Sequence, residues 1–170
     1  MIGVDGTMKL CEDLDVDPSD VSLLVLAYRL NCPRMCEFTQ DGWITGFTAM
    51  KYVYVMRVWL ICSITSLEDL QGMLPILRDS LKDKETFRDI YKYTFTFALL
   101  EPAQKVLPLD SAVAFWKLLL SGQWKDLEVW IEFLEERHGK GISKDTWNLL
   151  LDFIQSAKPG YEGHDLNGAW

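Results

Sequence analysis

The side chains that most often carry out chemistry in proteins are scarce in this sequence. Its 170 residues include only two histidines, His138 and His164. His138 is expected in the last turn of a helix, where the helix dipole favours a cation. The sequence contains no Gly-x-Ser-x-Gly, His-Glu-x-x-His, phosphate-binding loop or dinucleotide fingerprint. We therefore expect a protein that is not an enzyme.

The cysteines are the next residues that could bind or react. Four are present, at Cys11, Cys32, Cys36 and Cys62, and the pair at 32 and 36 has the spacing of half a metal site. No second Cys/His pair completes a tetrahedral set, so Cys36 is expected as a small buried hydrophobic residue. We predict no metal and no cofactor. Cysteines without regular spacing, and an N-terminus without a signal-peptide pattern, favour a reducing compartment, the nucleus and cytoplasm.

The charge balance limits the class of partner. Lys and Arg number 17 against 25 Asp and Glu, which gives a formal net charge of -8 and an isoelectric point near 4.7. The phosphates of nucleic acid or of an anionic membrane would be repelled by such a protein. We expect no nucleic-acid or membrane partner, and a basic protein partner fits better.

Helix signals recur along nearly the whole chain, and strand alternation is scarce, so the predicted fold class is all-α. In the first half, Asp17 before Pro18 is expected to cap one helix and Thr39 a shorter one. Thr65, three residues before Glu68, has the spacing of a capping box and predicts the start of a third.

The second half predicts four more helices. Apolar residues at helical spacing fill residues 87–98, and Pro102 ends that run. Asp110 is expected to cap the next helix. A helix over about residues 125–138 ends at a glycine, and Ser143 is expected to cap the last one.

One stretch, YVYVMRVWLICSI at residues 52–64, interrupts this regularity. It is almost wholly apolar, and about 13 residues fall short of the roughly 20 that a bilayer-spanning helix needs. A buried helix extension or a core strand is the simplest interpretation. A membrane-interface anchor would need a polar face rich in Lys and Arg. The third alternative is an insertion foreign to the parent fold.

Two stretches, residues 2–10 and 37–47, each look like a loop that leads into an EF-hand helix. Calcium needs several oxygen ligands at alternating loop positions and a bidentate glutamate at the end. Val4, Thr7 and Phe38 lie where such a site would need carboxylates. We therefore expect EF-hand-like geometry held by apolar packing, without the ion.

Several longer motifs occur together and in order along the chain. They are IGVDG, LCEDLDVDP, the triplet Cys36 to Phe38, FRDIYKYTFTFA, LPLDSAVAFWKLLL, GISKDTWNLLLDF and GAW. This set resembles the defective-in-cullin-neddylation (DCN1-like) family, whose helical domain is named for potentiating neddylation (PONY). Members are scaffold-type co-ligases that promote transfer of a ubiquitin-like modifier from its conjugating enzyme to a cullin lysine.

The resemblance implies two EF-hand-like lobes packed together as one PONY domain. Residues 1–64 would form the N-terminal lobe, with the apparent insertion at 52–64, and residues 65–170 the C-terminal lobe. The first helix of the first lobe and the last helix of the second are missing relative to the family pattern. An alternative transcript or gene model would explain all three departures.

The resemblance also implies a pocket between the lobes for the N-terminally acetylated methionine of the conjugating enzyme. Acetylation removes an ammonium charge that would be costly to bury unpaired among apolar side chains. Thr7 and Met35 depart from the family pattern, so hydrogen bonding to the acetyl group is expected to differ. The implied lining is Val4, Thr7, Leu10, Leu23, Leu26, Met35, Cys36, Phe38, Phe97, Phe115 and Leu118.

A second implied surface is an acidic patch for the basic C-terminal winged-helix domain of a cullin. Two family positions match Asp145 and Ala169, and the third is absent because the sequence stops at Trp170. An acid in the first turn of a helix is favoured anyway, which is the purely structural alternative for Asp145. The RING subunit of cullin ligases would be engaged indirectly.

The leading hypothesis is thus a non-enzymatic scaffold in cullin neddylation. The alternative is a truncated, splice-type variant that acts as a peptide-binding adaptor or competitor without productive cullin contact. A calcium sensor is a third hypothesis, from a different functional class.

Overall fold

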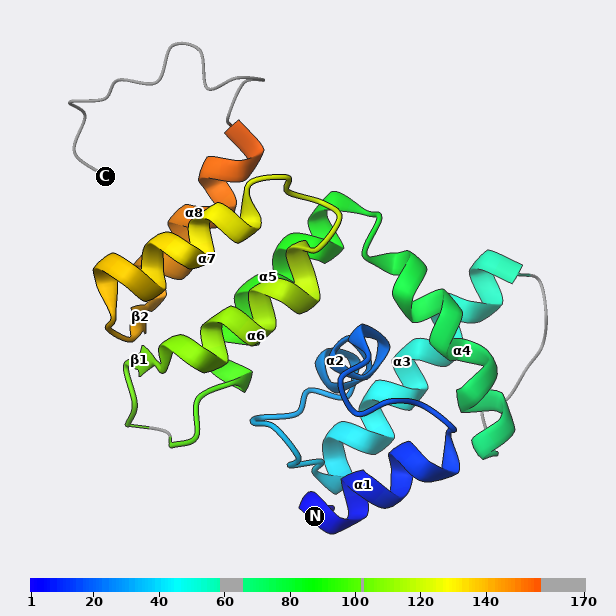
Figure 1. The fold of residues 1–170 in the computed structure, drawn as a ribbon. Helices are drawn as coiled ribbons and strands as arrows, with labels where there is room; N and C mark the ends of the chain where they lie inside the picture. Colours follow the sequence, from blue (N-terminus) through cyan, green and yellow to red (C-terminus); the bar gives the residue numbers. More distant parts are fainter. Residues whose placement is uncertain (59–65, 102, 157–170) are drawn as a thin grey trace.

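The computed structural model describes residues 1–58, 66–101 and 103–156 (Figure 1). Within these ranges the regular secondary structure is helical apart from two short strands, β1 (Val106–Leu107) and β2 (Ile142–Ser143), which confirms the all-α prediction. A π-helical turn, η1 (Leu134–His138), directly continues α7. The α-helices are α1 (Val4–Asp13), α2 (Val21–Arg29), α3 (Gln40–Val58), α4 (Leu67–Ser80), α5 (Lys84–Phe97), α6 (Leu109–Leu120), α7 (Leu127–Phe133) and α8 (Lys144–Ser156).

Two of the predicted helix caps are confirmed. The Thr39 hydroxyl accepts a hydrogen bond from the Gly42 amide at 3.1 Å, at the start of α3. The Ser143 hydroxyl accepts one from the Thr146 amide, also at 3.1 Å, at the start of α8. Each hydroxyl satisfies an amide that has no partner inside its helix.

Three predicted helix starts were wrong by one to three residues. Asp17 binds the Ser19 amide in a separate turn, and the cap of α2 is Asp20, which accepts from the Ser22 amide at 2.8 Å. The capping box of α4 is Ser66 with Asp69, one residue later than predicted. α6 begins directly after Pro108, so that Asp110 lies in its first turn.

The apolar stretch that begins at Tyr52 is helical as far as it is described. α3 continues through Val58, which agrees with a helix extension, and residues 59–64 lie outside the described residues. No helix within the described ranges is both long and apolar enough to span a membrane.

Short antiparallel pairings join the loops in front of four helices. Ile2, before α1, exchanges backbone hydrogen bonds of 2.9 and 3.0 Å with Phe38, near the start of α3. β1 pairs with β2 in the same way, with Leu107 opposite Ile142, in front of α6 and α8. Paired loops between helices are the arrangement of EF-hand pairs, so the expected geometry is present twice.

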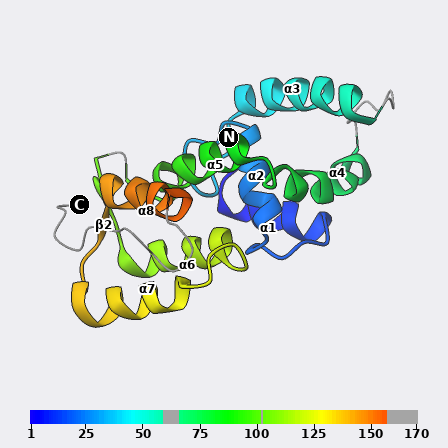
Figure 2. The same ribbon diagram turned by 90° about the horizontal axis from the view of Figure 1, so that it is seen from above.

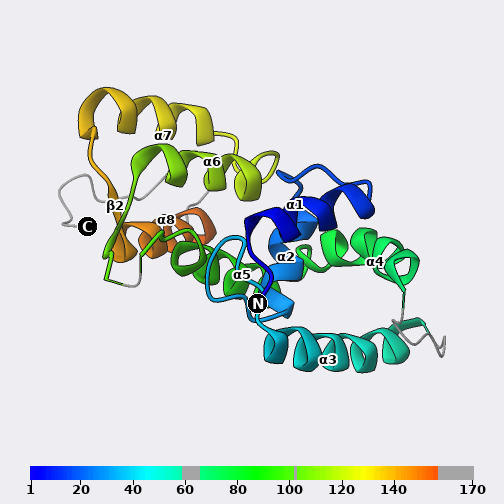
Figure 3. The same cartoon turned by 90° about the horizontal axis from the view of Figure 1, so that it is seen from below.

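The helices of the first half of the chain meet those of the second half along α5. In Figure 1 the helices α1 to α4 lie on one side, and α6, α7 and α8 with the strands lie on the other. α5 contacts α2 on one side and α6 and α8 on the other, and α4 packs against α2. Figures 2 and 3 show α3 running along an outer edge of the molecule. The division into lobes at residue 64 stays a prediction, since that residue is not described.

A hydrogen-bonded aromatic cluster lies between α5, α6 and α8. Trp116 Nε1 donates to the Tyr91 hydroxyl at 2.8 Å, and that hydroxyl donates to the Trp147 carbonyl oxygen at 2.9 Å. Trp147 Nε1 donates in turn to the Tyr91 carbonyl oxygen at 2.9 Å. All three side chains are fully buried, and because each polar atom has a partner the cluster stabilises one packing arrangement.

Candidate functional site

The loop before Phe38 is hydrogen-bonded to the end of α5. The Met35 amide donates to the Phe97 carbonyl oxygen at 3.0 Å, and the Tyr93 hydroxyl donates to the Cys32 carbonyl oxygen at 2.7 Å. Burial, followed by the nearby Cys32 thiol, raises the pKa of Tyr93, so its hydroxyl stays protonated and able to donate. These two bonds hold part of the first half of the chain against the second.

Aromatic rings line this junction. The Phe97 ring stacks on Tyr93 with centroids 5.3 Å apart and meets Phe115 of α6 edge to face at 6.4 Å. Tyr93 also meets Tyr28 of α2 edge to face at 5.3 Å. The Met35 side chain, 45% exposed, comes from the loop that is bonded to Phe97. The junction is therefore a largely buried aromatic cluster built by α2, α5, α6 and the loop, with Met35 exposed beside it, and we call it the Phe97 cluster.

Cys36 sits in this loop with a strained backbone. Its φ of 58° lies in the left-handed region, which a non-glycine residue adopts at a cost of about 1 kcal/mol or more. The tight turn closed by the Glu37 amide on the Arg34 carbonyl oxygen, at 3.2 Å, accompanies this conformation. The Met35 hydrogen bond to Phe97 holds this loop beside the end of α5 and helps to offset the strain.

The other predicted lining residues are placed in several ways. Leu10, Leu26 and Phe38 are buried core residues, and Leu23, Phe115 and Leu118 are partly buried against the same core. Thr7 uses its hydroxyl on the Gly3 carbonyl oxygen at 2.9 Å, and Val4 is exposed. Within the described ranges no hydrogen bond or ring contact joins Val4 or Thr7 to the Phe97 cluster. The acetyl-methionine pocket as a whole stays a prediction.

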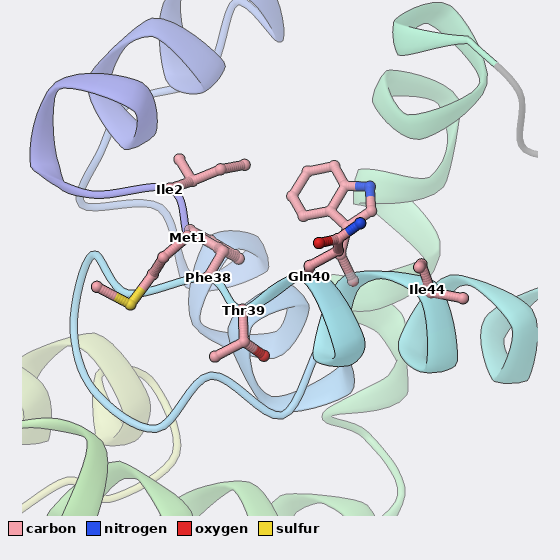
Figure 4. Close-up of a pocket in the computed structure, with 7 residues that line it drawn as sticks. Met1, Ile2, Phe38, Thr39, Gln40 and Ile44 are labelled. Carbon is pink, nitrogen blue, oxygen red and sulfur yellow. The ribbon is translucent and has the colours of Figure 1, made fainter.

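A cavity that the sequence analysis missed lies where the chain start meets α3. Its volume is about 390 Å³, and Phe38 is its one lining residue that also belongs to the predicted pocket. Figure 4 shows the side chains from the first residues and from the start of α3 around this space. The adjacent apolar residues Trp43 and Ile44 near the start of α3 were the only sequence signal for this cavity. The cavity itself depends on the pairing of Ile2 with Phe38, which is not local in sequence. The lining residues are Met1, Ile2, Phe38, Thr39, Gln40, Trp43 and Ile44.

Asp145, the described member of the predicted cullin-binding patch, lies at the start of α8. It is exposed in the first turn of α8, two residues after the cap at Ser143, and among the described residues its carboxylate has no ion-pair partner. Such a carboxylate can accept a hydrogen bond from a basic side chain of another protein. Ala169, the other predicted member, lies outside the described residues.

No metal chemistry emerges from the part of the chain that the structure describes. There, no group of three or more His, Cys, Asp or Glu side chains converges in a way that could hold an ion. Burial raises the pKa of the Cys32 thiol to about 12, so this group is an unreactive thiol at neutral pH.

Comparison with known proteins places these surfaces in a family. A cullin-binding family model matches residues 69–170, more than half of the chain. The chain is 32% identical over 170 residues to human DCN1-like protein 5, covering 100% of this chain and 66% of that protein. It is 35% identical over 170 residues to human DCN1-like protein 4, covering 100% of this chain and 54% of that protein.

A fungal relative extends the same comparison. The chain is 31% identical over 171 residues to Defective in cullin neddylation protein 1 of Yarrowia lipolytica, covering 99% of this chain and 66% of that protein. The chain thus spans 66% or less of the length of these curated relatives. With the family model, these identities show that the chain belongs to the DCN1-like, cullin-binding family.

Proposed function

We propose that the protein is a non-enzymatic scaffold that promotes cullin neddylation. It would bind the C-terminal winged-helix domain of a cullin and, at a second surface, the acetylated N-terminus of the neddylation conjugating enzyme. The observation that carries the proposal is the family match, together with two separate surfaces of suitable chemistry. The acidic net charge of -8 favours a basic partner such as a cullin winged helix.

The Phe97 cluster is the surface proposed for the conjugating enzyme. Met35 is exposed beside the aromatic rings of Phe97 and Phe115, and the one charged group over a ring of the cluster in the described residues, the Arg29 guanidinium, lies over Tyr28 at 5.7 Å. An acetylated methionine is uncharged and apolar, so it loses little hydration free energy there, whereas a free ammonium group would lose much more. The proposal therefore includes a preference for the acetylated terminus.

Asp145 is the residue proposed to contact the cullin. Because it is exposed and has no ion-pair partner among the described residues, its carboxylate is free to meet a basic side chain without breaking an internal contact. A charge pair of this kind contributes mainly to encounter rate and orientation, and it weakens with added salt.

Holding both partners would accelerate transfer without any reacting group on this chain. A scaffold that binds cullin and conjugating enzyme together raises the effective concentration of one near the other. It also restricts the orientation of the thioester towards the target lysine, which lowers the entropic part of the barrier. The RING subunit would be reached through the cullin. The proposed compartments are the nucleus and cytoplasm, where the buried thiols of Cys11 and Cys32 would stay reduced.

A reconstituted transfer assay tests this proposal. The modifier is loaded on its conjugating enzyme, acetylated or not, and transfer to a cullin–RING complex is timed with and without this chain. We expect acceleration with the acetylated enzyme, loss of that acceleration for Phe115→Ala, and little acceleration without acetylation. Absence of any acceleration by the folded chain would contradict the scaffold. If the chain binds an acetylated peptide but slows transfer, it is the adaptor or competitor instead.

A further inference from the structure

The side of α7 that faces away from the core carries an apolar row. Leu127 and Ile131 of α7 are buried, whereas Val129 and Phe133 are 66% and 52% exposed. Val129 and Phe133 are four residues apart, so they lie one above the other on a helix. Neither belongs to the Phe97 cluster or to the cavity beside Trp43. The side chains of these two residues are thus available to a partner.

An acidic row runs beside the apolar one. Residues 128–136 contain Glu128, Glu132, Glu135 and Glu136 and no Lys, Arg or His, and all four glutamates are exposed; Arg137 and His138 follow at the end of η1. Glu128 and Glu132 of α7 directly precede Val129 and Phe133 in sequence, and Glu136 follows four residues later in η1. None of the four makes an ion pair with the described residues. We call Val129, Phe133 and these three spaced glutamates the α7 outer face.

Phe133 is held in place although it is exposed. Its ring stacks on Trp130 with centroids 5.9 Å apart, and Trp130 packs edge to face on the buried Trp116 at 6.1 Å. An anchor that is already ordered loses little conformational entropy when a partner covers it. α7 also passes directly into the π-helical turn η1, a rare conformation that occurs often at functional sites.

The charges on this face select the class of partner. An anionic membrane or a nucleic acid would be repelled by the acidic row. A second copy of the chain would present the same acids and the same net charge of -8. A helix with apolar residues at spacings of three and four and with Lys or Arg beside them would match both rows.

We propose that the α7 outer face docks a basic amphipathic helix of a partner protein. Apolar side chains of that helix would cover Val129 and Phe133, and its basic side chains would meet Glu132 and Glu136. This inference does not rest on the proposed role in neddylation, because the residues that carry it lie outside both surfaces assigned to that role.

A binding experiment with a defined peptide tests the inference on the full chain. The probe is a fluorescently labelled synthetic peptide of Lys and Leu, with the leucines at helical spacing, followed by anisotropy. We expect binding that weakens with added salt, and amide NMR shifts confined to residues 127–138. A peptide of the same composition with scrambled order should bind at least about tenfold more weakly, because it cannot align an apolar row.

Matched variants separate this face from a general attraction to acidic protein. Phe133→Ser and the double variant Glu132→Lys, Glu136→Lys should each weaken binding about tenfold or more. The controls Leu149→Ser on α8 and Asp89→Lys on α5 change an apolar residue of similar exposure, 46% against 52%, and an exposed acid elsewhere. Equal binding of the scrambled peptide, equal loss in the controls, or shifts centred on the Phe97 cluster would overturn the proposal. Circular dichroism of each variant checks that it is folded.

Discussion

α3 and α8 begin with the same local sequence pattern, but the tryptophan near the start of each helix lies in different surroundings. Trp43 of α3 and Trp147 of α8 both lie five residues after the paired loop residue, Phe38 or Ile142, and four after the capping Thr or Ser. Trp147 is 0% exposed, whereas Trp43 is partly exposed and lines the cavity of about 390 Å³. Local sequence thus sets the cap and the register, while burial depends on elements far away in the chain.

The difference comes from what packs on each indole. Trp147 is covered by Tyr91 and Phe95 of α5, with ring centroids 4.8 and 6.1 Å away, and by Trp116 of α6 at 5.1 Å. Trp43 contacts Phe38 and Phe47, which belong to its own loop and helix. Trp43 also lines the cavity of about 390 Å³. We therefore expect Trp147 to contribute more to the stability of the protein than Trp43 does.

The largest change in stability is expected when each of the two tryptophans is replaced by alanine. Trp147→Ala should lower the free energy of unfolding by about 3–5 kcal/mol, because it leaves a buried cavity and removes the donor to Tyr91. Trp43→Ala should cost less, about 1–2 kcal/mol, since part of the indole is already exposed. Urea unfolding followed by circular dichroism measures both. Equal losses would show that the two indoles are equivalent and that the comparison is wrong.

A glycine in α3 gives a second test of the comparison between α3 and α8. At the position of Leu150 in α8, α3 has Gly46, where an added Cβ would come within 2.5 Å of the Arg29 carbonyl oxygen and 2.8 Å of Leu30 Cα. Gly46→Ala should therefore destabilise the protein by about 1–3 kcal/mol, since backbone atoms must move.

The matched control is Gly72→Ala in α4, where an added Cβ would meet no atom within 4 Å. This change should stabilise the protein by about 0.5–1 kcal/mol, because alanine favours a helix interior. Midpoints of urea unfolding that move in opposite directions support the close approach of α3 to the end of α2. A neutral Gly46→Ala variant would contradict it.

An ion pair between α4 and the start of α2 should make the stability of the protein depend on pH. Arg78 of α4 donates two hydrogen bonds to Asp20, the cap of α2, one of them 3.0 Å long, and the Asp20 side chain is 21% exposed. Partial burial alone would raise the pKa of Asp20, but hydrogen bonds from Arg78 and Ser22 outweigh it and lower the pKa to about 2. The pair should contribute about 1–2 kcal/mol above the ordinary carboxyl pKa of about 4, discounted for solvent exposure.

Because the folded-state pKa is lowered, this stability is present at neutral pH and is lost as the pH falls from about 4 towards 2. Comparing urea midpoints of the wild type and Asp20→Asn at pH 7 and at low pH measures it, and the difference between them should shrink in acid. A difference that stays constant would exclude the pair as its source.

The smallest change in stability is expected at the ion pair between α5 and α8. Arg88 of α5 meets Asp152 of α8 at 2.8 Å, but both side chains are about half exposed. Arg88→Ala should change the free energy of unfolding by less than about 0.5 kcal/mol, because water and salt screen an exposed pair. A loss as large as that of Asp20→Asn, measured by the same urea unfolding, would show that the two ion pairs contribute equally.

Local signals in the sequence were sufficient for the fold class and for several helix ends. Hydroxyl caps at Thr39 and Ser143 and the stop at Gly139, whose φ is 57°, depend on neighbouring residues and were predicted correctly. The start of α2 was missed because Asp17 and Asp20 are both good caps. Arg78 of α4, distant in sequence, binds the second one. Competing local signals were thus separated by a tertiary contact.

The same limit applies to the candidate site. The resemblance led to Met35, Phe97 and Phe115, which the structure brings together, because family motifs carry information about distant contacts. The cavity beside Trp43 needed the pairing of Ile2 with Phe38, which no local pattern specifies. The exposed row on α7 was overlooked because a helical period indicates only that one side is buried.

Titration of a cullin C-terminal domain tests the proposed scaffold role most directly, and the repeated pattern supplies its control. Asp41 of α3 holds the same position before Trp43 that Asp145 of α8 holds before Trp147, and both acids are exposed. In isothermal calorimetry, Asp145→Lys should weaken binding at least about tenfold through charge reversal. Asp41→Lys should change the affinity by about twofold or less, as expected for an exposed charge outside the interface. Equal affinities for the wild type and Asp145→Lys, or an equal loss in both variants, would contradict the assignment.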